Sequence, residues 1–378
     1  MIIAQPQGVK TPSGDACDAK KKERMRRCKN ARQCVCGLSV RHRPPAAPPA
    51  GGRKQSGNQA VAGRRCDGYA LALTYPATLP DLRVAQSIEE NEVTATIEAT
   101  QPRTTSPSVN PNKALWEKGD FTRIASTMRE SGEALVRAIG VKPGERVLDL
   151  GSGDGTTALP AAQLGADVLA VDIAANLVRA GQARARQAGL ANLSFQEGDA
   201  SALDALEDAS FDLSVSIFGA MFAPRPFDVA RELVRVTRRG GRIVMGNWIP
   251  GDPTLVAQIL RISAAYTPPP PAGFVSPMTW GVEGDVLERF AAAGIPAAQV
   301  AFSRDTFTFR HPGTPAAFVE AFRDYYGPTM NAYDAAAKNG KAEALHQELV
   351  DLFSRQNQSG RADATVIPAT FLRVTVSR

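Results

Sequence analysis

A run of glycines and acids, VLDLGSGDGTTALPAA at 147–162, contains the residue types and spacing of a ligand-binding loop. Gly151, Gly153 and Gly155 follow a short apolar run and precede a helix-like segment. A strand, a glycine turn and a helix start form the usual cradle for an adenine-containing ligand. Such cradles usually hold phosphates, but this run carries Asp149 and Asp154 and has no lysine or arginine. Its ligand must therefore tolerate carboxylates.

The spacing of the glycines does not match the common phosphate-binding loops. The dinucleotide pattern G-x-G-x-x-G needs glycine at position 156, where Thr156 stands, and no Gly-Lys-Ser/Thr follows as in a P-loop. Two further acids end the next predicted strands, Asp172 and Asp199. Carboxylates a few ångströms from a pyrophosphate would repel it. A nicotinamide-dependent enzyme therefore stays an alternative rather than the main hypothesis.

S-adenosylmethionine suits these acids better, because it combines an adenosine part with a sulfonium, an ammonium and no phosphate. Asp172 is predicted to accept hydrogen bonds from both ribose hydroxyls, as the acid at this spacing does for dinucleotides. Asp199 is predicted to accept from the adenine amino group. Glycines in the loop would let the backbone approach the ligand closely.

In the segments VLDLGSGDG, VLAVD, EGDA and RRGGRIVM, residues 146–248 resemble a class I S-adenosylmethionine-dependent methyltransferase of the type 11 (ubiquinone/menaquinone-methylase-like) group. The resemblance implies cofactor contacts from Asp149, Gly151, Ser152, Gly153, Asp172, Ile173, Asp199, Ala200 and Ser216. In that family Asp149, Gly151 and Gly153 would line the methionine and ribose part, and Ile173 would flank the adenine. Ser216 would lie at the position whose backbone contacts the methionine amino group in that family.

The resemblance also implies an α/β fold, with a Rossmann-like, doubly wound sheet of seven strands whose last strand is antiparallel. Strands are predicted at 146–150, 167–172, 193–199, 211–218 and 242–248, and helices at 156–165, 175–189 and 225–241. Residues 112–140 have broadly helical spacing. The period-two segments TFTFR and FLRVTV predict two antiparallel edge strands, with two helices between Pro315 and Arg355. Residues 112–135 and 265–360 are predicted to form a helical cap.

The methyl acceptor is harder to predict, because in-line displacement at the sulfonium methyl depends mainly on positioning. The segment SIFGAMFAPRP lacks the Asn/Asp-Pro-Pro-Tyr/Phe pattern of nucleobase methylases and the metal-binding acids of the catechol type. We therefore expect no nucleic-acid substrate for the body and no metal. An apolar substrate pocket is predicted from Trp116, Phe218, Met221, Phe222 and Trp280, with Trp248 and Phe274 as further candidates.

This wall suits a small, partly hydrophobic acceptor, or a cationic amine held over aromatic faces. A general base is needed only where the acceptor must lose a proton, and its candidates are His311, Tyr325 and Tyr326. Methylation of carbon or oxygen is favoured. The alternatives are N-methylation of a small amine, a non-catalytic S-adenosylmethionine-binding regulator, and an NAD(P)-dependent oxidoreductase.

Composition separates residues 1–110 from the body at 111–378. Residues 1–70 hold 15 Lys and Arg against 4 Asp and Glu, and all five cysteines lie within the first 66 residues at spacings that match no common zinc pattern. This proline- and glycine-rich segment is predicted to be a disordered basic leader. It would be a solvated tail, a nucleic-acid or membrane contact, a transit peptide, or an over-extended gene start. Without a long apolar run, we expect a cytoplasmic protein.

Overall fold

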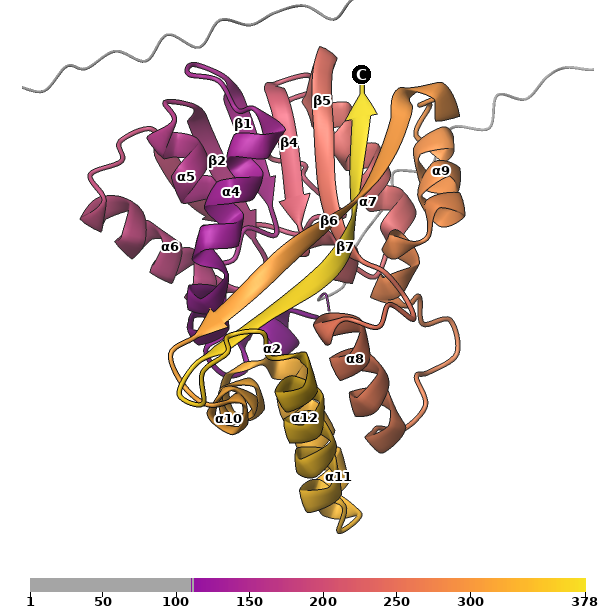
Figure 1. Cartoon of the computed structure of the whole chain (residues 1–378). Helices are drawn as coiled ribbons and strands as arrows, with labels where there is room; N and C mark the ends of the chain where they lie inside the picture. The colour runs from indigo at the N-terminus through magenta and orange to yellow at the C-terminus, as the bar shows by residue number, and fades with distance from the viewer. Residues whose placement is uncertain (1–109, 111) are drawn as a thin grey trace, which may run out of the picture. The chain divides into compact units, whose positions relative to one another are not determined.

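The computed structural model describes residue 110 and residues 112–378. The predicted basic leader lies outside these residues except for Asn110, so its disorder and the domain boundary at 110/111 stay predictions. In the described part, helices and strands alternate through a sheet that carries helices on both faces (Figure 1).

Seven strands form one sheet in the order β3-β2-β1-β4-β5-β7-β6. They are β1 (Arg146–Leu150), β2 (Asp167–Asp172), β3 (Leu193–Glu197), β4 (Phe211–Ile217), β5 (Thr237–Trp248), β6 (Val300–His311) and β7 (Thr365–Ser377). The first five are parallel, and β7 runs antiparallel to both β5 and β6. The predicted doubly wound sheet with antiparallel last strands is confirmed.

Apolar side chains on both faces of the central strands build two cores. Along β1, Val147 belongs to one buried cluster, whereas Leu148 and Leu150 belong to the other. Parallel strands covered on both faces need such nearly continuous apolar runs. The helices that flank these strands are α4 (Arg129–Ile139), α5 (Ala158–Gln163), α6 (Ala175–Gln187), α7 (Pro226–Val236) and α9 (Glu283–Ala292).

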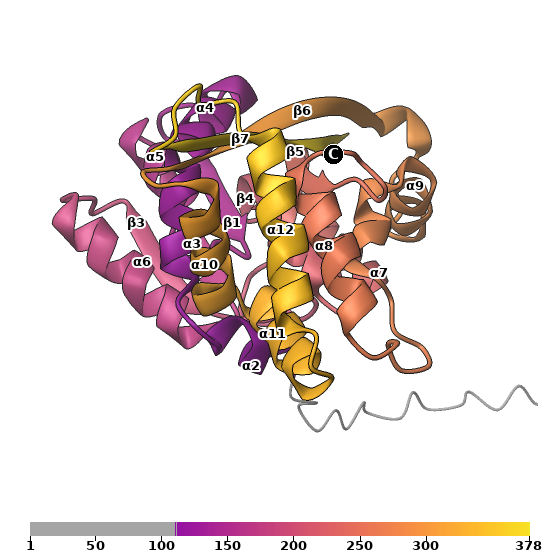
Figure 2. The ribbon, with the colours of Figure 1, turned by 60° about the horizontal axis from the view of Figure 1, so that its bottom comes forward.

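The remaining helices gather at the end of the sheet where the parallel strands end (Figures 1 and 2). They are α2 (Asn112–Glu117), α3 (Phe121–Ala125), α8 (Leu255–Tyr266), α10 (Pro315–Tyr325), α11 (Gly327–Lys338) and α12 (Ala342–Gln356). Four short 3-10 helices complete the described part: η1 (Ser126–Met128), η2 (Ala220–Phe222), η3 (Pro277–Gly281) and η4 (Ala297–Gln299). These helices overlap the predicted cap at 112–135 and 265–360 only in part, because α8 lies almost wholly before residue 265 and β6, within it, is a strand of the sheet. They lie over the edge of the sheet where ligands bind in such folds.

Three predicted helices differ from the structure. The predicted helix at 225–241 ends at Val236, because the chain turns into β5, where Gly240 has a left-handed φ of 76°. Residues 112–140 are broken into α2, α3, η1 and α4, with a left-handed turn at Gly119. Between Pro315 and Arg355 there are three helices instead of two, because a proline at the start of α11 separates it from α10.

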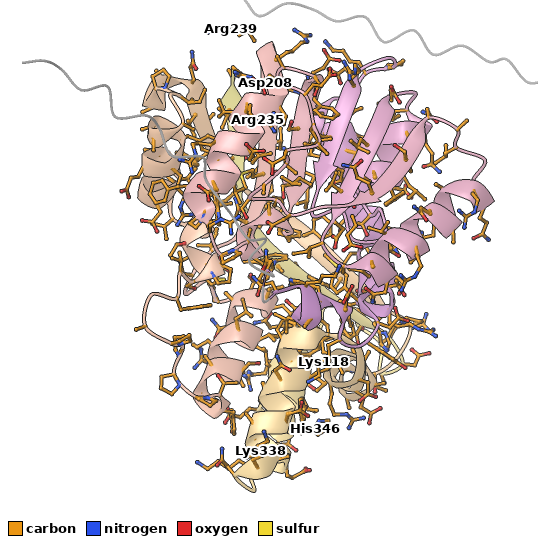
Figure 3. The ribbon with its side chains drawn as sticks, turned by 180° about the vertical axis from the view of Figure 1, so that it is seen from behind. Lys118, Asp208, Arg235, Arg239, Lys338 and His346 are labelled. Carbon is orange, nitrogen blue, oxygen red and sulfur yellow. The ribbon has the colours of Figure 1, made fainter. Side chains whose placement is uncertain are left out.

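Charged side chains join elements at both ends of the molecule. Arg235 pairs with Asp208 at the end of the sheet opposite the cap, where Figure 3 also labels Arg239. On the cap, Lys118 pairs with Asp334 at 2.6 Å and so connects the end of α2 to α11. These exposed pairs contribute little stability each, but they orient the elements that they join.

A close approach of two glycine backbones joins the ends of β1 and β4. Gly151 follows β1 with a left-handed φ of 70°, and a Cβ atom added there would lie 2.6 Å from the Cα of Gly219. Gly219 follows β4, and a Cβ atom on it would meet Gly151 at the same distance. Only glycine on both sides allows this contact, so the two loops lie against each other.

We expect Gly219→Ala to destabilise the protein by about 1–3 kcal/mol, because the new methyl group overlaps backbone atoms that have no room to move. Urea denaturation monitored by circular dichroism measures the change. Gly284→Ala is the control, since Gly284 lies on α9 with no atom within 4 Å of an added Cβ. A Gly219→Ala protein as stable as the Gly284→Ala protein would contradict the packing described here.

Candidate functional site

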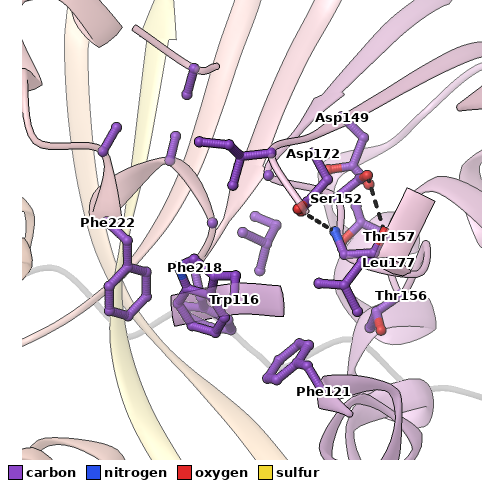
Figure 4. Close-up of a pocket in the computed structure, with 18 of the residues that line it drawn as sticks. Trp116, Phe121, Asp149, Ser152, Thr156, Thr157, Asp172, Leu177, Phe218 and Phe222 are labelled. Carbon is purple, nitrogen blue, oxygen red and sulfur yellow. Dashed lines mark hydrogen bonds between the residues drawn. The ribbon is translucent and has the colours of Figure 1, made fainter. Parts of the chain in front are cut away.

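A deep cavity lies where the strand order reverses between β1 and β4, the usual ligand position in open α/β sheets. It encloses about 950 Å³ of empty space, including open solvent at its mouth. We call it the acidic cavity, and its lining includes Asp149, Gly153, Asp172, Asp199 and Phe218. Figure 4 shows Asp149 and Asp172 together on one side, facing the ring of Trp116 across the cavity.

Asp172, at the end of β2, holds the glycine loop in place. Its Oδ2 accepts a hydrogen bond from the backbone N–H of Gly153 at 2.8 Å, and its Oδ1 accepts from the N–H of Ala174 at 2.9 Å. Each carboxylate oxygen keeps a lone pair for a further donor. Gly153 itself has a left-handed φ of 57°, and a Cβ atom added there would lie in ordinary van der Waals contact with the Phe121 ring, at 3.8 Å.

Asp154 differs from its neighbours, because two arginines compensate its charge. Arg129 from α4 pairs with the buried carboxylate and also bonds Thr156, and Arg184 from α6 lies 3.6 Å away. The sequence near the loop contains no cation, but these arginines come from helices 25 and 30 residues away. Thr157 rather than Asp154 is the N-cap residue of α5, and its own side chain makes no capping hydrogen bond.

Asp149 is buried, and its Oδ2 has no hydrogen-bond partner within the described chain. Burial, and then the neighbouring charge of Asp172, raise the pKa of Asp149 to about 7. Burial likewise raises the pKa of Asp172. No lysine or arginine is among the described residues that line the acidic cavity. An unpaired buried carboxylate oxygen is costly unless a ligand donor meets it.

Asp199 lies at the opposite end of the acidic cavity, after β3. Its Oδ1 accepts from the backbone and the hydroxyl of Ser201, and its Oδ2 accepts from Nδ2 of Asn110 at 3.0 Å. These hydrogen bonds outweigh burial and lower the pKa of Asp199, which stays ionised. Ile173 and Ala200, also predicted for the adenine part, line the same cavity.

Eight of the nine predicted cofactor residues therefore line one cavity, together with Trp116, Phe218 and Phe222 from the predicted substrate wall. Ser216 is the exception. It is buried, its Oγ donates to the carbonyl of Leu150 at 2.7 Å, and it accepts from the N–H of Ala220 at 2.9 Å. The strand continues past it, so Ile217 and the residues after it reach the cavity instead.

Two predicted members of the substrate wall point elsewhere. Met221 is buried in the core beneath η2, whereas the adjacent Phe222 faces the cavity. Trp280 is also buried, with its ring packed on Phe290 and under the guanidinium of Arg289, 4.6 Å from the ring centre. Neither lines the two cavities described here.

Of the three candidates for a general base, two also lie outside these cavities. His311 ends β6 with its ring stacked on Phe318 at 4.7 Å, and burial lowers its pKa. Tyr325 is half-buried beneath the guanidinium of Arg123, 5.8 Å from the ring centre. Tyr326 is the one that lines a cavity.

A second cavity of about 440 Å³ shares Trp116, Phe121, Met128, Phe218 and Phe222 with the first. We call it the aromatic cavity. Its remaining walls come from β5, β6, α3, α8, α10 and the start of α11, with Trp248 and Phe322 among them. Its described lining contains no Asp, Glu, Lys, Arg or His. A strongly acidic space thus opens beside an uncharged aromatic one.

Phe218 stands at the boundary of the two cavities in a strained conformation. It directly follows β4 and has a φ of 62°, which is uncommon for a bulky side chain. Its ring stacks on Trp248 with 3.7 Å between centres and meets the rings of Phe307 and Phe371 edge-on. Such strain costs on the order of 1–3 kcal/mol and persists where the packing around it fixes the backbone.

Helix α2 lies within the predicted cap at 112–135 and contributes the predicted Trp116 to the acidic cavity, whereas Asn110 and Asn112 were not among the predicted site residues. Asn110 and Asn112 line the cavity beside Trp116, and Nδ2 of Asn112 donates to the carbonyl of Phe222. The helix has no buried residue, and polar contacts such as the Lys113 ion pair with Glu197 hold it. Two asparagines at the start of so short a helix give no sequence signal for a place in the cavity wall.

None of the helices from α2 to α12 is both long and apolar enough to cross a membrane. Nor do His, Cys, Asp and Glu within the described part gather in a group of three that could hold a metal ion.

The chain is similar to known proteins over much of its length. Residues 148–245 match the family described as "Methyltransferase domain". An uncharacterized protein of Mycobacterium tuberculosis is 36% identical over 261 residues, which cover 68% of this chain and 90% of that protein. A demethylmenaquinone methyltransferase of Renibacterium salmoninarum is 36% identical over 114 residues, 30% of this chain and 46% of that protein.

Among solved structures, the YcgJ protein of Bacillus subtilis is similar with a TM-score of 0.44 and 21% identity, over 66% of this chain and 99% of that chain. The fold and the matched domain define a class I S-adenosylmethionine-dependent methyltransferase. The chain belongs to the type 11 group of this family, and its cofactor is S-adenosylmethionine.

The acidic cavity fits this cofactor. Its uncompensated carboxylates suit a ligand with hydroxyl and ammonium donors, and the unpaired Oδ2 of Asp149 lacks the donor that such a ligand brings. Gly153 leaves open the space that a side chain would fill. A phosphate-bearing nicotinamide cofactor would meet the same carboxylates without a cation in the described lining.

We expect the unliganded protein to lose stability as the pH rises from about 4 to about 7. The folded state keeps a proton on Asp149 up to about pH 7, whereas the unfolded chain loses it near 3.8. The stabilising contribution is complete below the lower value and is lost as the pH passes through the higher one, at up to about 1.4 kcal/mol per pH unit. Urea denaturation at pH 5, 6, 7 and 8 measures this slope.

Asp149→Asn should flatten the slope, because an amide of the same shape does not titrate. Asp204→Asn, at an exposed position outside the described lining of both cavities, is the matched control and should keep the wild-type slope. Equal slopes in the Asp149→Asn and wild-type proteins would contradict the environment described for Asp149.

Proposed function

We propose that this methyltransferase acts on carbon or oxygen of a small apolar acceptor that binds in the aromatic cavity. The observation that carries the proposal is the contact between the two cavities, whose shared wall is formed by Trp116, Phe121, Met128, Phe218 and Phe222. A ligand in the acidic cavity and a ligand in the aromatic cavity would meet there. The uncharged lining favours an acceptor whose surface is mostly apolar.

For the cofactor, we propose that Asp172 accepts from the ribose hydroxyls with the lone pairs left by its two backbone hydrogen bonds. Asp149 would face the cationic end of the ligand with its unpaired oxygen. Asp199 would accept a hydrogen bond from the adenine amino group. In this structure its Oδ2 accepts from Nδ2 of Asn110 instead. When bound, S-adenosylmethionine supplies an electrophilic methyl group on a positively charged sulfur.

The chain contributes positioning and exclusion of water rather than proton transfer. Aromatic walls hold an acceptor against the boundary at Phe218, and positioning alone supplies a large part of a displacement rate. The described lining of the aromatic cavity holds no carboxylate or imidazole that could act as a base at neutral pH. This favours a carbon nucleophile or an acidic hydroxyl, which give up their proton readily. Aromatic faces also suit a cationic amine, so N-methylation is the outcome to exclude.

The acceptor class is tested with S-adenosylmethionine labelled in the methyl group and three probe sets: naphthols, cyclic diketones and small tertiary or secondary amines. We expect label on the naphthols or diketones and none on the amines. Label on the amines alone would contradict the proposal. Leu260→Trp tests the place of the acceptor, because the larger side chain would fill the aromatic cavity, and Leu260 lines this cavity but not the acidic one. It should lose most of the transfer and keep the wild-type affinity for the cofactor.

We expect Asp172→Ala to weaken S-adenosylmethionine binding by about 1–3 kcal/mol, the cost of unpaired hydrogen-bond partners. The affinity falls for two reasons. The ribose hydroxyls lose their acceptor, and the N–H groups of Gly153 and Ala174 lose the carboxylate that holds the loop in place. Isothermal titration calorimetry measures the affinity, with Asp204→Ala as the control. Unchanged binding in Asp172→Ala would show that the cofactor does not use this carboxylate.

A further inference from the structure

Tyr326 is the only residue with a titratable side chain among the described residues that line the aromatic cavity. It lies at the junction between α10 and α11. Its backbone N–H donates to the carbonyl of Phe322 at 3.1 Å, and its carbonyl accepts from the N–H of Met330 at 2.9 Å. Both sides of the junction are thus hydrogen-bonded, which fixes the point where the side chain leaves the backbone.

Three other aromatic rings hold the ring of Tyr326. Its centre lies 5.9 Å from that of Trp116, 6.0 Å from that of Phe121 and 5.4 Å from that of Phe322, in edge-on or tilted arrangements. These rings come from α2, α3 and α10, three elements that close around the cavity. A phenol ring fixed from three sides can move its hydroxyl only a little.

The hydroxyl of Tyr326 has no hydrogen-bond partner within residues 110 and 112–378, and it is not one of the polar atoms sealed from all open space. The residue is 7% exposed and lines the aromatic cavity. A polar group in an apolar wall is costly unless a ligand or a water pairs with it. Burial raises the pKa of Tyr326 well above its usual range, so the group stays a neutral donor.

We propose that Tyr326 is the positioning residue for the acceptor: its hydroxyl donates a hydrogen bond to an oxygen of a ring-shaped, otherwise apolar molecule, an aryl alcohol or an enolisable ketone. This inference rests on the proposed function. An electron pair on that oxygen, or on the carbon beside it, forms the bond to the methyl carbon while the methyl–sulfur bond breaks toward sulfur. The proton of the acceptor leaves to water, since Tyr326 is already protonated.

The test compares two probes of nearly the same shape, 2-naphthol and 2-methylnaphthalene, of which only the first can pair with the hydroxyl. Equilibrium dialysis against the full chain with S-adenosylhomocysteine measures both affinities. We expect the wild-type protein to bind the naphthol about tenfold more tightly than the hydrocarbon, the value of one net hydrogen bond. In Tyr326→Phe this ratio should fall to about one, with the hydrocarbon affinity unchanged.

Tyr333→Phe is the matched control. The hydroxyl of Tyr333 bonds Nδ1 of His346 at 2.9 Å, and the residue lines neither described cavity. Figure 3 shows His346 on the cap helices, far from the sheet. This variant should keep the wild-type ratio. Calorimetry with S-adenosylhomocysteine should give wild-type affinity for both variants, because Tyr326 does not line the acidic cavity.

Two outcomes separate the proposals. If both probes bind and Tyr326→Phe keeps the tenfold preference, the role of Tyr326 is wrong and the proposed function stands. If neither probe binds while the cofactor product does, the aromatic cavity is not an acceptor site, and both proposals are overturned. A ratio that falls in Tyr326→Phe and not in Tyr333→Phe supports the positioning role, since a merely structural effect would weaken both probes equally.

Discussion

The site depends on the two hydrogen bonds that Asp172 accepts from the backbone of Gly153 and Ala174. They tie the loop after β1 to the end of β2, and the glycine contact between Gly151 and Gly219 then ties the same loop to the end of β4. Three parallel strands are in this way fixed at one edge. Asp149 and Asp172 are near enough to interact, and burial together with this repulsion raises the pKa of Asp149.

Polarity divides the site into two parts. Arg129 and Arg184 neutralise Asp154 from outside the loop, so the charge left inside the acidic cavity belongs to carboxylates without an ion-pair partner in the described chain. The neighbouring aromatic cavity offers a single phenol. Phe218 separates these environments with a strained backbone that its ring contacts hold in place. A sulfonium and an electron-rich apolar acceptor would each find a matching environment on its own side.

The sequence predicted the central fold well, because the first strands are buried on both faces and end in glycines or acids. Eight of the nine residues that it proposed as cofactor contacts line the acidic cavity, since these lie at or just after the ends of strands. The prediction failed for side chains whose position is set by contacts with residues far away in the sequence. The arginines on Asp154, the commitment of Ser216 to Leu150, and the burial of Met221 and Trp280 depend on elements far away in the chain. Local spacing does not encode such partners.

Helix α2 lies over the acidic cavity without a buried residue of its own, held by contacts that include the Lys113 and Lys118 ion pairs. The side chains in these pairs are a third or more exposed, so dissolved salt screens them. The aromatic cavity rests instead on apolar packing, which salt does not weaken. Ionic strength therefore acts unequally on the walls of the site: it weakens the attachment of α2, which carries Trp116 at the boundary of the two cavities, and leaves the apolar packing of α8 and α10 intact.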